Sequence, residues 1–350
     1  MSVIKPLERL DILITIFNQE EIIERVLYSV LKNTTTAFNL ILVFDGCKDR
    51  TQPRAISYLK KFKSRFLLEL VTRETPNLFE TRANIFGFKL SMSDYLITIQ
   101  DDMVIREYGW EKRITYPLRK FDDVFAVSAR SAQDIISIGN GREQYVHQAA
   151  FETQTLTRDI FAVRDVGIRG PLAFRMEYLR ELNYLNEKYA PCALDDTELS
   201  LRAWVTKRWK IGAFGIDYLS KREWSKVSAP DSTMKTWETW RRNLDYLAND
   251  YREYLAKGIK HTEDIVIPVS EIDYQKSFLI QIRKFLWILP YPLRLDKRRM
   301  MVVWNTSFYN IIAAIKYPLI QVLKLIFGNK FVAFVDQHGF KKAIVNKVGK

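Results

Sequence analysis

Short apolar runs that alternate with amphipathic stretches constrain this chain more than any other feature. Runs of five to seven mostly apolar residues lie at 11–17, 40–44, 66–71, 95–99 and 124–129. Between them, apolar residues recur at helical spacing over 22–31, 52–62 and 81–90. Short apolar runs are typical of strands buried on both faces, and their alternation with helices predicts βαβ units. We therefore expect an α/β fold with a mainly parallel sheet and helices on both of its faces.

The second half of the chain has a less regular pattern. Residues 131–164 are polar and contain Gly139-Asn140-Gly141, so we expect an irregular crossing segment there. Helices are predicted over 176–182, from Asp195 to Trp204, and after Asp231 until Gly258 ends the last of them. The second half should therefore add helices to the sheet of the first.

Composition excludes several classes of protein. With 350 residues, of which 47% are hydrophobic, the chain is long and apolar enough to build a packed core. Two cysteines without a CxxC partner and three histidines argue against a disulfide scaffold and against a zinc site made of Cys and His. The sequence contains no GxGxxG, no GxxxxGK[ST] and no GxSxG, which disfavours nicotinamide enzymes, P-loop NTPases and α/β-hydrolases.

The hydropathy pattern predicts a cytoplasmic protein. The first 17 residues lack an apolar stretch followed by a small-residue cleavage site, so we expect no secretory signal. The most apolar long segment, 311–327, is interrupted by Lys316, Pro318 and Lys324, so a membrane-spanning helix is not expected.

Positive charge is concentrated at the C-terminal end. Residues 276–350 contain 14 Lys or Arg and two acids, whereas residues 1–275 contain 40 basic and 39 acidic residues. The basic residues of this tail alternate with aromatic and aliphatic stretches, a pattern that suits the headgroup region of an anionic membrane. A small helical subdomain with solvated lysines would give the same pattern. Nucleic acid would also attract such charge, but we do not expect it as a partner.

Acidic side chains follow two of the predicted strands. Asp101 and Asp102 come directly after 95–99, and Asp45 follows 40–44. The carboxyl ends of parallel strands form the ligand-binding edge of such sheets. Two adjacent carboxylates favour Mg²⁺ or Mn²⁺ bound together with a diphosphate. A plain turn would explain each acid as well, since Asp-Gly is common in turns and Asp caps helices.

A second acidic pair, Asp195-Asp196, begins a predicted helix. Helix starts stabilise carboxylates through the dipole and through free backbone N–H groups, so capping alone would explain the pair. A carboxylate fixed in this way can also serve as a general base for an attacking hydroxyl. Both interpretations remain open at this stage.

Taken in order, these features resemble glycosyltransferase family 2, the inverting enzymes with the GT-A fold. The resemblance spans roughly residues 8–225 and rests on six segments in the family's order, which are 15–18, 44–51, 82–87, 100–102, 169–174 and 195–202. It implies transfer of a sugar from a nucleoside-diphosphate sugar to a hydroxyl of a glycan or lipid-linked acceptor. Roles in glycan and cell-surface polysaccharide biosynthesis, with attachment to the inner face of the membrane, would follow.

The resemblance also assigns roles to residues. It implies a base at Asp196 or Asp195 and a Mg²⁺ or Mn²⁺ ligand at Asp102. Donor-nucleotide contacts are implied for Thr15, Phe17, Asn18, Asp45, Arg82, Asn84 and Asp101. Contacts on the acceptor and diphosphate side are implied for Gly170, Pro171, Arg202 and Arg222.

This chain departs from the family pattern at three places. Phe44 and Gln100 replace acids of the nucleotide and metal motifs, and 221–225 contains no His where many members have a metal ligand. A catalytically degenerate nucleotide-sugar binding module is therefore one alternative. A nucleotidyltransferase, which also uses carboxylate-bound metal, is the other.

The resemblance and the charge of the tail together predict the domain organisation. We expect a glycosyltransferase domain over 1–230, with a nucleotide-sugar half at about 8–130 and an acceptor half at about 131–230. A helix and linker would occupy 231–275, and the basic, apolar extension would occupy 276–350.

Overall fold

The computed structural model describes residues 4–138, 144–152, 159–220, 224, 233–257 and 263–268. All of these residues fall within one compact unit, Met1–Ile288. The Gly139-Asn140-Gly141 segment, Arg222 and the basic tail 276–350 lie outside the described residues. The predictions made for those segments, and for the domain boundaries, therefore stay predictions.

Strands and helices alternate through the first half of the chain, as the apolar pattern predicts. The strands are β1 (Arg9–Ile16), β2 (Ala37–Asp45), β3 (Leu67–Thr75), β4 (Tyr95–Gln100), β5 (Met103–Ile105) and β6 (Val124–Ser128). The helices are α1 (Ile23–Asn33), α2 (Thr51–Lys61), α3 (Phe79–Lys89), α4 (Trp110–Ile114) and α5 (Tyr116–Lys120).

The second half continues with more strands than expected. Its strands are β7 (Ser131–Ile138), β8 (Gln144–Glu152), β9 (Ile160–Arg164), β10 (Val166–Ile168), β11 (Leu172–Arg175), β12 (Lys210–Ala213), β13 (Tyr218–Ser220) and β14 (Glu263–Val266). Its helices are α6 (Met176–Glu181), the 3₁₀ turn η1 (Glu187–Tyr189), α7 (Asp195–Lys207), α8 (Thr233–Asp250) and α9 (Arg252–Lys257).

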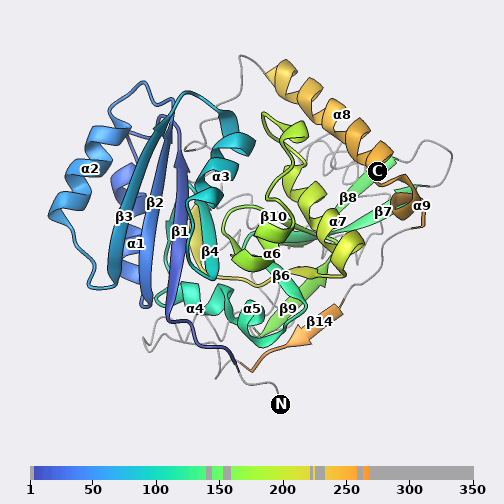
Figure 1. Ribbon diagram of the computed structural model, residues 1–350, viewed down its shortest axis with the longest axis horizontal. Helices are drawn as coiled ribbons and strands as arrows, with labels where there is room; N and C mark the ends of the chain where they lie inside the picture. Colours follow the sequence, from blue (N-terminus) through green and yellow to red (C-terminus); the bar gives the residue numbers. More distant parts are fainter. Residues whose placement is uncertain are drawn as a thin grey trace, which may run out of the picture. The chain divides into compact units, whose positions relative to one another are not determined.

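One nine-stranded sheet forms the centre of the unit, in the order β14-β9-β12-β6-β11-β4-β1-β2-β3 (Figure 1). The block β4-β1-β2-β3 is parallel throughout. Beyond it, β11 runs antiparallel to both β4 and β6, and β9 is antiparallel to β12. The predicted α/β class with a mainly parallel sheet is therefore confirmed, and each antiparallel pair includes a strand of the second half.

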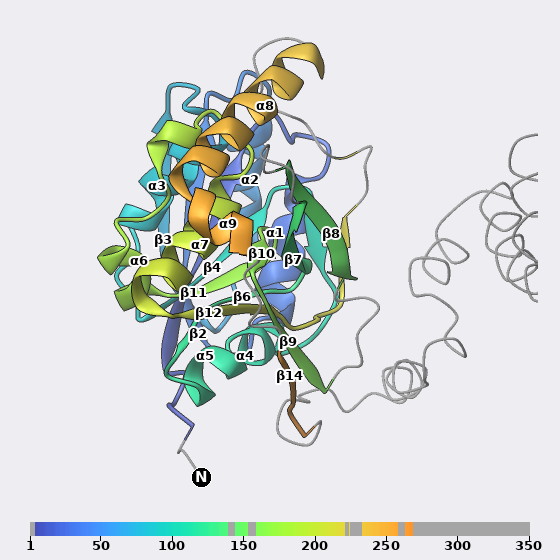
Figure 2. The ribbon, with the colours of Figure 1, turned by 90° about the vertical axis from the view of Figure 1, so that its right-hand side faces the viewer.

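The order of the parallel strands creates a switch point. The chain passes from β1 through α1 to β2 and through α2 to β3, then returns through α3 to β4 on the other side of β1. Because such crossovers are right-handed, the return places α3 on the opposite face from α1 and α2, as Figures 1 and 2 show. The carboxyl ends of β1 and β4 therefore border an open crevice, which is where sheets of this kind bind ligands.

The apolar side chains of the predicted strands pack together in one buried core. Leu13, Val43, Leu96 and Phe174 come from four neighbouring strands, and each is at most 1% exposed within one apolar cluster. Gly87 of α3 packs directly on Leu13, because an added Cβ would lie 2.5 Å from its side chain. The helix can therefore lie close to the sheet, which fixes the direction in which its first turn faces the crevice.

The structure corrects the expectation of an irregular segment over 131–164. These residues contain β7 and β8, which pair antiparallel from Ser131 with Glu152 to Ile138 with Gln144. They also contain β9, which joins the main sheet beside β12. Polar and apolar residues are mixed in 131–138 and 144–152, so no continuous apolar run marks β7 and β8. The short apolar run of β9 pairs with both β12 and β14.

The last predicted helix is divided in the structure. Residues 233–257 form α8 and α9, with Tyr251 as the turn between them. Leu247 and Leu255 are buried against Val166 and Leu201, so both helices pack on the unit through one apolar cluster. Among the described residues, no helix is both long and apolar enough to cross a bilayer.

Candidate functional site

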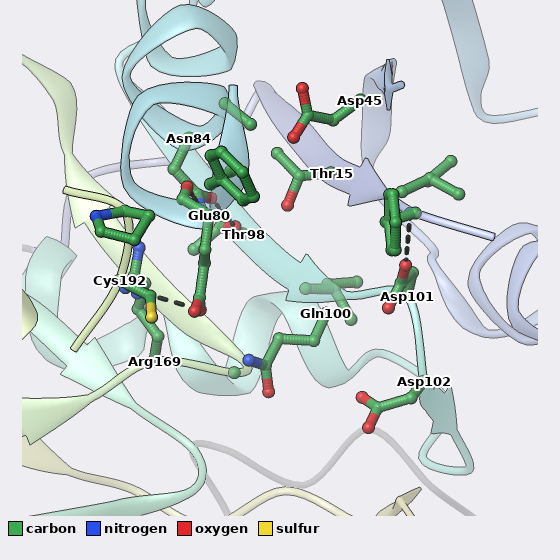
Figure 3. Close-up of a pocket in the computed structure, with 17 residues that line it drawn as sticks. Thr15, Asp45, Glu80, Asn84, Thr98, Gln100, Asp101, Asp102, Arg169 and Cys192 are labelled. Carbon is green, nitrogen blue, oxygen red and sulfur yellow. Dashed lines mark hydrogen bonds and ion pairs between the residues drawn. The ribbon is translucent and has the colours of Figure 1, made fainter. Parts of the chain in front are cut away.

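A cleft opens at the carboxyl ends of β1 and β4, and its empty space is about 850 Å³ when its open mouth is included. The cleft is lined by Thr15, Ile16, Phe17, Asp45, Phe79, Glu80, Ala83, Asn84, Thr98, Ile99, Gln100, Asp101, Asp102, Arg169, Gly170, Pro191 and Cys192. Figure 3 shows Glu80, Arg169 and Cys192 on one side, Asp101 and Asp102 on the other, and Gln100 between them.

Asp101 holds the loop that follows β1. Its Oδ2 accepts a hydrogen bond from the Phe17 backbone N–H at 2.8 Å, and its Oδ1 accepts one from Gln19 Nε2 at 3.2 Å. Burial raises the pKa of Asp101 to about 7, and the neighbouring Asp102 adds to that rise. Both oxygens of Asp101 thus have protein donors.

Asp102 follows Asp101 on the other side of the strand end. The Asp102 side chain accepts a hydrogen bond from the Ser220 hydroxyl at 3.3 Å, across the β5–β13 pair. In the part of the chain that the structure describes, no three His, Cys, Asp or Glu side chains are grouped closely enough to hold a metal ion by themselves. Mg²⁺ commonly binds through one or two carboxylates together with substrate phosphates. Asp101 and Asp102 at this strand end are compatible with a metal that is shared with a diphosphate.

Asp45 lines the cleft and also accepts hydrogen bonds from the end of β3 and the segment that follows it. Its Oδ1 accepts hydrogen bonds from the Thr75 hydroxyl at 2.8 Å and from the Leu78 backbone N–H at 2.6 Å. The next residue, Gly46, has φ +65°, and a Cβ there would lie 2.7 Å from Asn77. The turn interpretation is therefore correct, and the same carboxylate still lines the cleft.

The two acids at the start of α7 have different environments. Asp195 is fully buried, and its oxygens accept hydrogen bonds from Arg169 Nη2 at 2.5 Å and from the Thr81 hydroxyl at 2.8 Å. Asp196 is half-buried, and its oxygens accept from the backbone N–H groups of Arg169 at 3.2 Å and Thr197 at 2.8 Å. Neither acid is the N-cap, which is Leu194. Only Asp196 retains the exposure that a base needs to meet an acceptor.

Glu80 and Arg169 are site residues that the sequence analysis missed. The Arg169 guanidinium is 7% exposed and lies 3.5 Å from Glu80, whose side chain is 38% exposed. The carboxylates around Arg169 raise the pKa of its guanidinium despite burial. Burial raises the pKa of Glu80 and of Asp196, and Arg169 partly offsets both rises. Glu80 stands two positions before the segment 82–87, and Arg169 is the first residue of the segment 169–174, which are the sequence signals that could have indicated them.

The remaining implied donor residues divide into two groups. Thr15 and Asn84 line the cleft, and Asn84 is held there because its Nδ2 donates to the Glu80 carbonyl at 2.7 Å. Asn18 instead accepts from the Lys48 backbone N–H at 2.8 Å, so it joins the loops after β1 and β2. Arg82 is exposed and lies 3.5 Å from Glu187. Neither Asn18 nor Arg82 belongs to the lining of the cleft.

The acceptor-side residues are divided in the same way. Gly170 lines the cleft, with φ +87° and Gln100 in close contact, whereas Pro171 is buried behind it. The structure does not bring Arg202 to the cleft. Its guanidinium pairs with Glu198 at 2.9 Å and donates to the Tyr184 carbonyl at 2.8 Å, so helix packing directs it elsewhere.

Comparisons with known proteins agree with this geometry. The family model described as glycosyl transferase family 2 matches residues 11–182. That match includes both strand ends of the cleft and Arg169, and it ends before Asp195 and Asp196. No curated protein matches the sequence.

Solved structures show the fold at low sequence identity. GalNAc-T7 with UDP, GalNAc and Mn²⁺ is 12% identical, with a TM-score of 0.51, over 70% of this chain and 49% of that one. S. aureus TarS is 14% identical, with a TM-score of 0.44, over 68% of this chain and 39% of that one. Residues 1–349 of TarS with UDP-GlcNAc are 14% identical, with a TM-score of 0.47, over 71% of this chain and 70% of that one.

The chain thus spans 39% of the length of TarS and 49% of that of GalNAc-T7. The carboxyl ends of β1, β2 and β4, with the acids Asp45, Asp101 and Asp102, all fall within the matched family region. Residues 11–182 therefore match the model of glycosyl transferase family 2, and the chain has the GT-A fold.

Proposed function

We propose that the chain transfers a sugar from a nucleoside-diphosphate sugar to a hydroxyl acceptor with inversion. The observation that carries the proposal is one cleft, at the switch point of a family 2 domain, with Asp45, Asp101 and Asp102 on its strand ends and Asp196 beside its wall. UDP, which the GalNAc-T7 structure contains, is the first nucleotide to test.

The donor occupies the side of the cleft next to β1 and β2 in this proposal. Thr15, Phe17, Asp45 and Asn84 line that side, and Asp101 fixes the Phe17 backbone. Asp102 would hold a Mg²⁺ or Mn²⁺ ion that comes with the diphosphate. When bound, such an ion stabilises the negative charge that develops on the leaving nucleoside diphosphate.

Asp196 takes the proton from the acceptor hydroxyl in this proposal. Its carboxylate is fixed by two backbone N–H groups and stays half-exposed, so it can receive a proton from a group in the cleft. A base of this kind contributes ~10²–10⁴-fold to the rate. In-line attack by the acceptor oxygen, on the face opposite the leaving diphosphate, inverts the anomeric carbon.

The acceptor is proposed to be a glycan or a lipid-linked precursor at an anionic membrane surface. Support comes from the sequence, in which residues 276–350 combine 14 basic residues and two acids with long apolar stretches. Deleting 276–350 should lower the fraction that pellets with phosphatidylglycerol vesicles, provided that circular dichroism shows the shortened chain to be folded. An unchanged pelleting fraction would contradict membrane attachment.

A thermal-shift panel tests the donor site. UDP, GDP, dTDP and their sugars would be added with and without Mn²⁺ to the full chain, to Asp102→Ala and to Asp122→Ala. Asp122 is an exposed carboxylate that does not line the cleft, so it is the control. A ligand at a hundredfold excess over its Kd stabilises by ~2.7 kcal/mol, which is readily measured.

A metal-dependent shift with one nucleotide, lost in Asp102→Ala and kept in Asp122→Ala, is the expected result. A shift that survives in Asp102→Ala would remove Asp102 from the metal site. Product analysis then separates the reactions, because a glycosyltransferase releases a nucleoside diphosphate and a nucleotidyltransferase releases pyrophosphate. Binding without release of either product would contradict a catalytic role.

A further inference from the structure

One buried arginine joins carboxylates from two helices at the wall of the cleft. Arg169, between β10 and β11, places Nη2 2.5 Å from Asp195 Oδ1 and 3.5 Å from Glu80 Oε1. Its own backbone N–H donates to Asp196 Oδ2 at 3.2 Å. A single residue therefore contacts two acids from the first turn of α7 and one from the first turn of α3, and Figure 3 shows the pair formed by Glu80 and Arg169.

The charges at this wall do not cancel. Three carboxylates face one guanidinium, and Glu80 and Asp196 each experience Asp195 as a like charge. Arg130 is a second cation on this side, since it acts on Glu80 and its Nη1 lies 3.5 Å from the Arg169 carbonyl. The Cys192 thiol has a pKa raised to about 11 by burial, so it is neutral at physiological pH. The excess negative charge therefore falls on the two half-exposed acids, Glu80 and Asp196.

Glu80 has no evident structural task in this arrangement. The first turn of α7 supplies Asp196 with the Thr197 N–H at 2.8 Å, and Asp195 Oδ1 accepts from the Asp196 N–H at 3.0 Å. Asp195 keeps its short contact with Arg169 whether or not Glu80 is present, because the contact to Glu80 is a longer ion pair on the exposed side. Glu80 consequently acts on Asp196 through charge, both directly and by sharing the guanidinium.

We propose that Arg169 and Glu80 are positioning residues that set the proton affinity of Asp196 in opposite directions and so determine the pH range in which the chain transfers sugar. The proposal rests on the proposed function, in which Asp196 is the base. Arg169 orients the Asp196 carboxylate through its N–H and favours the ionised form. Glu80 opposes ionisation, which keeps Asp196 basic enough to take a proton from a hydroxyl near neutral pH.

The test is the dependence of kcat/KM on pH in the full chain. An opposite charge within ~4–6 Å shifts a carboxyl pKa by ~1–3 units, and the cleft is partly open to water, so we expect shifts near the lower end. In Glu80→Gln the acidic limb should move about one pH unit lower. In Arg169→Met it should move about one unit higher, and Arg169→Lys should restore it towards the wild-type position. Glu24→Gln is the matched control, because Glu24 is 43% exposed and pairs with Arg54 at 3.1 Å away from the cleft.

Glu80→Gln decides the proposal if Arg169→Met does not fold. An acidic limb in Glu80→Gln that coincides with that of Glu24→Gln would overturn the proposal, even if the plateau rate falls, because a purely structural residue lowers the rate without moving the limb. If the wild type transfers no sugar, the proposed function fails separately. Carboxyl ¹³C NMR of Asp196, assigned with Asp196→Asn, then decides the inference, and an unchanged titration midpoint in Glu80→Gln would overturn it.

Discussion

Exchanging each acid at the start of α7 for asparagine should separate catalysis from stability. Asp195 and Arg169 are 1% and 7% exposed, and removing one charge of a buried pair costs ~3–5 kcal/mol. In Asp195→Asn, Glu80 still lies 3.5 Å from the Arg169 guanidinium and partly compensates its charge. We therefore expect the free energy of unfolding to fall by about 3 kcal/mol, the lower end of that range. At ~2–4 °C per kcal/mol, the melting temperature should fall by roughly 6–12 °C.

Asp196→Asn should show the opposite pattern. Its amide oxygen can still accept one of the two backbone hydrogen bonds, and the side chain is half-buried, so the melting temperature should change little. Loss of the base should lower kcat by ~10²–10⁴-fold, equivalent to ~2.7–5.5 kcal/mol of transition-state stabilisation. UDP should still raise the melting temperature of this variant, because Asp196 does not line the nucleotide side of the cleft.

Calorimetric melting and initial transfer rates on both variants check these values. Asp250→Asn is the control, since Asp250 is 38% exposed in a surface pair with Lys188, and such pairs contribute under ~1 kcal/mol. Near wild-type turnover in Asp196→Asn would remove Asp196 from the role of base. A melting temperature of Asp195→Asn equal to that of the Asp250→Asn control would refute the reasoning about the buried pair.

Three further changes test the walls of the cleft. Asp101→Asn should lower the free energy of unfolding in urea by ~1–3 kcal/mol and weaken UDP binding, because the single amide oxygen cannot accept from both the Phe17 N–H and Gln19. Unchanged stability and UDP affinity would contradict this. Gly170→Ala should lower the free energy of unfolding by ~1–3 kcal/mol, since φ is +87° and a Cβ would lie 2.6 Å from the Met103 side chain. An unchanged free energy of unfolding would show that the loop can adjust. The rate at which iodoacetamide alkylates Cys192, measured by peptide mass mapping, should rise about tenfold per pH unit from pH 8 towards the thiol pKa of about 11. Bound UDP should slow this alkylation. A rate independent of pH would contradict the burial of the thiol.

The sequence by itself was sufficient to determine which strand ends carry the chemistry. Apolar runs that end in polar residues predict buried parallel strands, and parallel strands bring their carboxyl ends to one edge. Thr15, Asp45, Asp101 and Asp102 all meet in one cleft for this reason. The match to the glycosyl transferase family 2 model covers residues 11–182 and includes all four of these residues.

The strands of the second half were less predictable. Residues 131–164 were expected to be irregular, yet they contain β7, β8 and β9. A strand at an edge or in a hairpin needs no continuous apolar run, since one face or one edge meets solvent. Hydrogen bonding to a partner strand stabilised these segments, and that partner cannot be read from local periodicity.

Only the tertiary structure decided which acid of α7 stays partly exposed and which is buried. Asp195 and Asp196 are adjacent in sequence, and both suit a helix start or a base. Asp195 is buried because Thr81 and Arg169 reach it from distant parts of the chain, and Arg202 is held away from the cleft by Glu198 and nearby carbonyl groups. Such contacts depend on how helices pack on the sheet. Local propensity and motif order therefore place residues at the correct edge, whereas packing decides which side chains carry charge into the cleft.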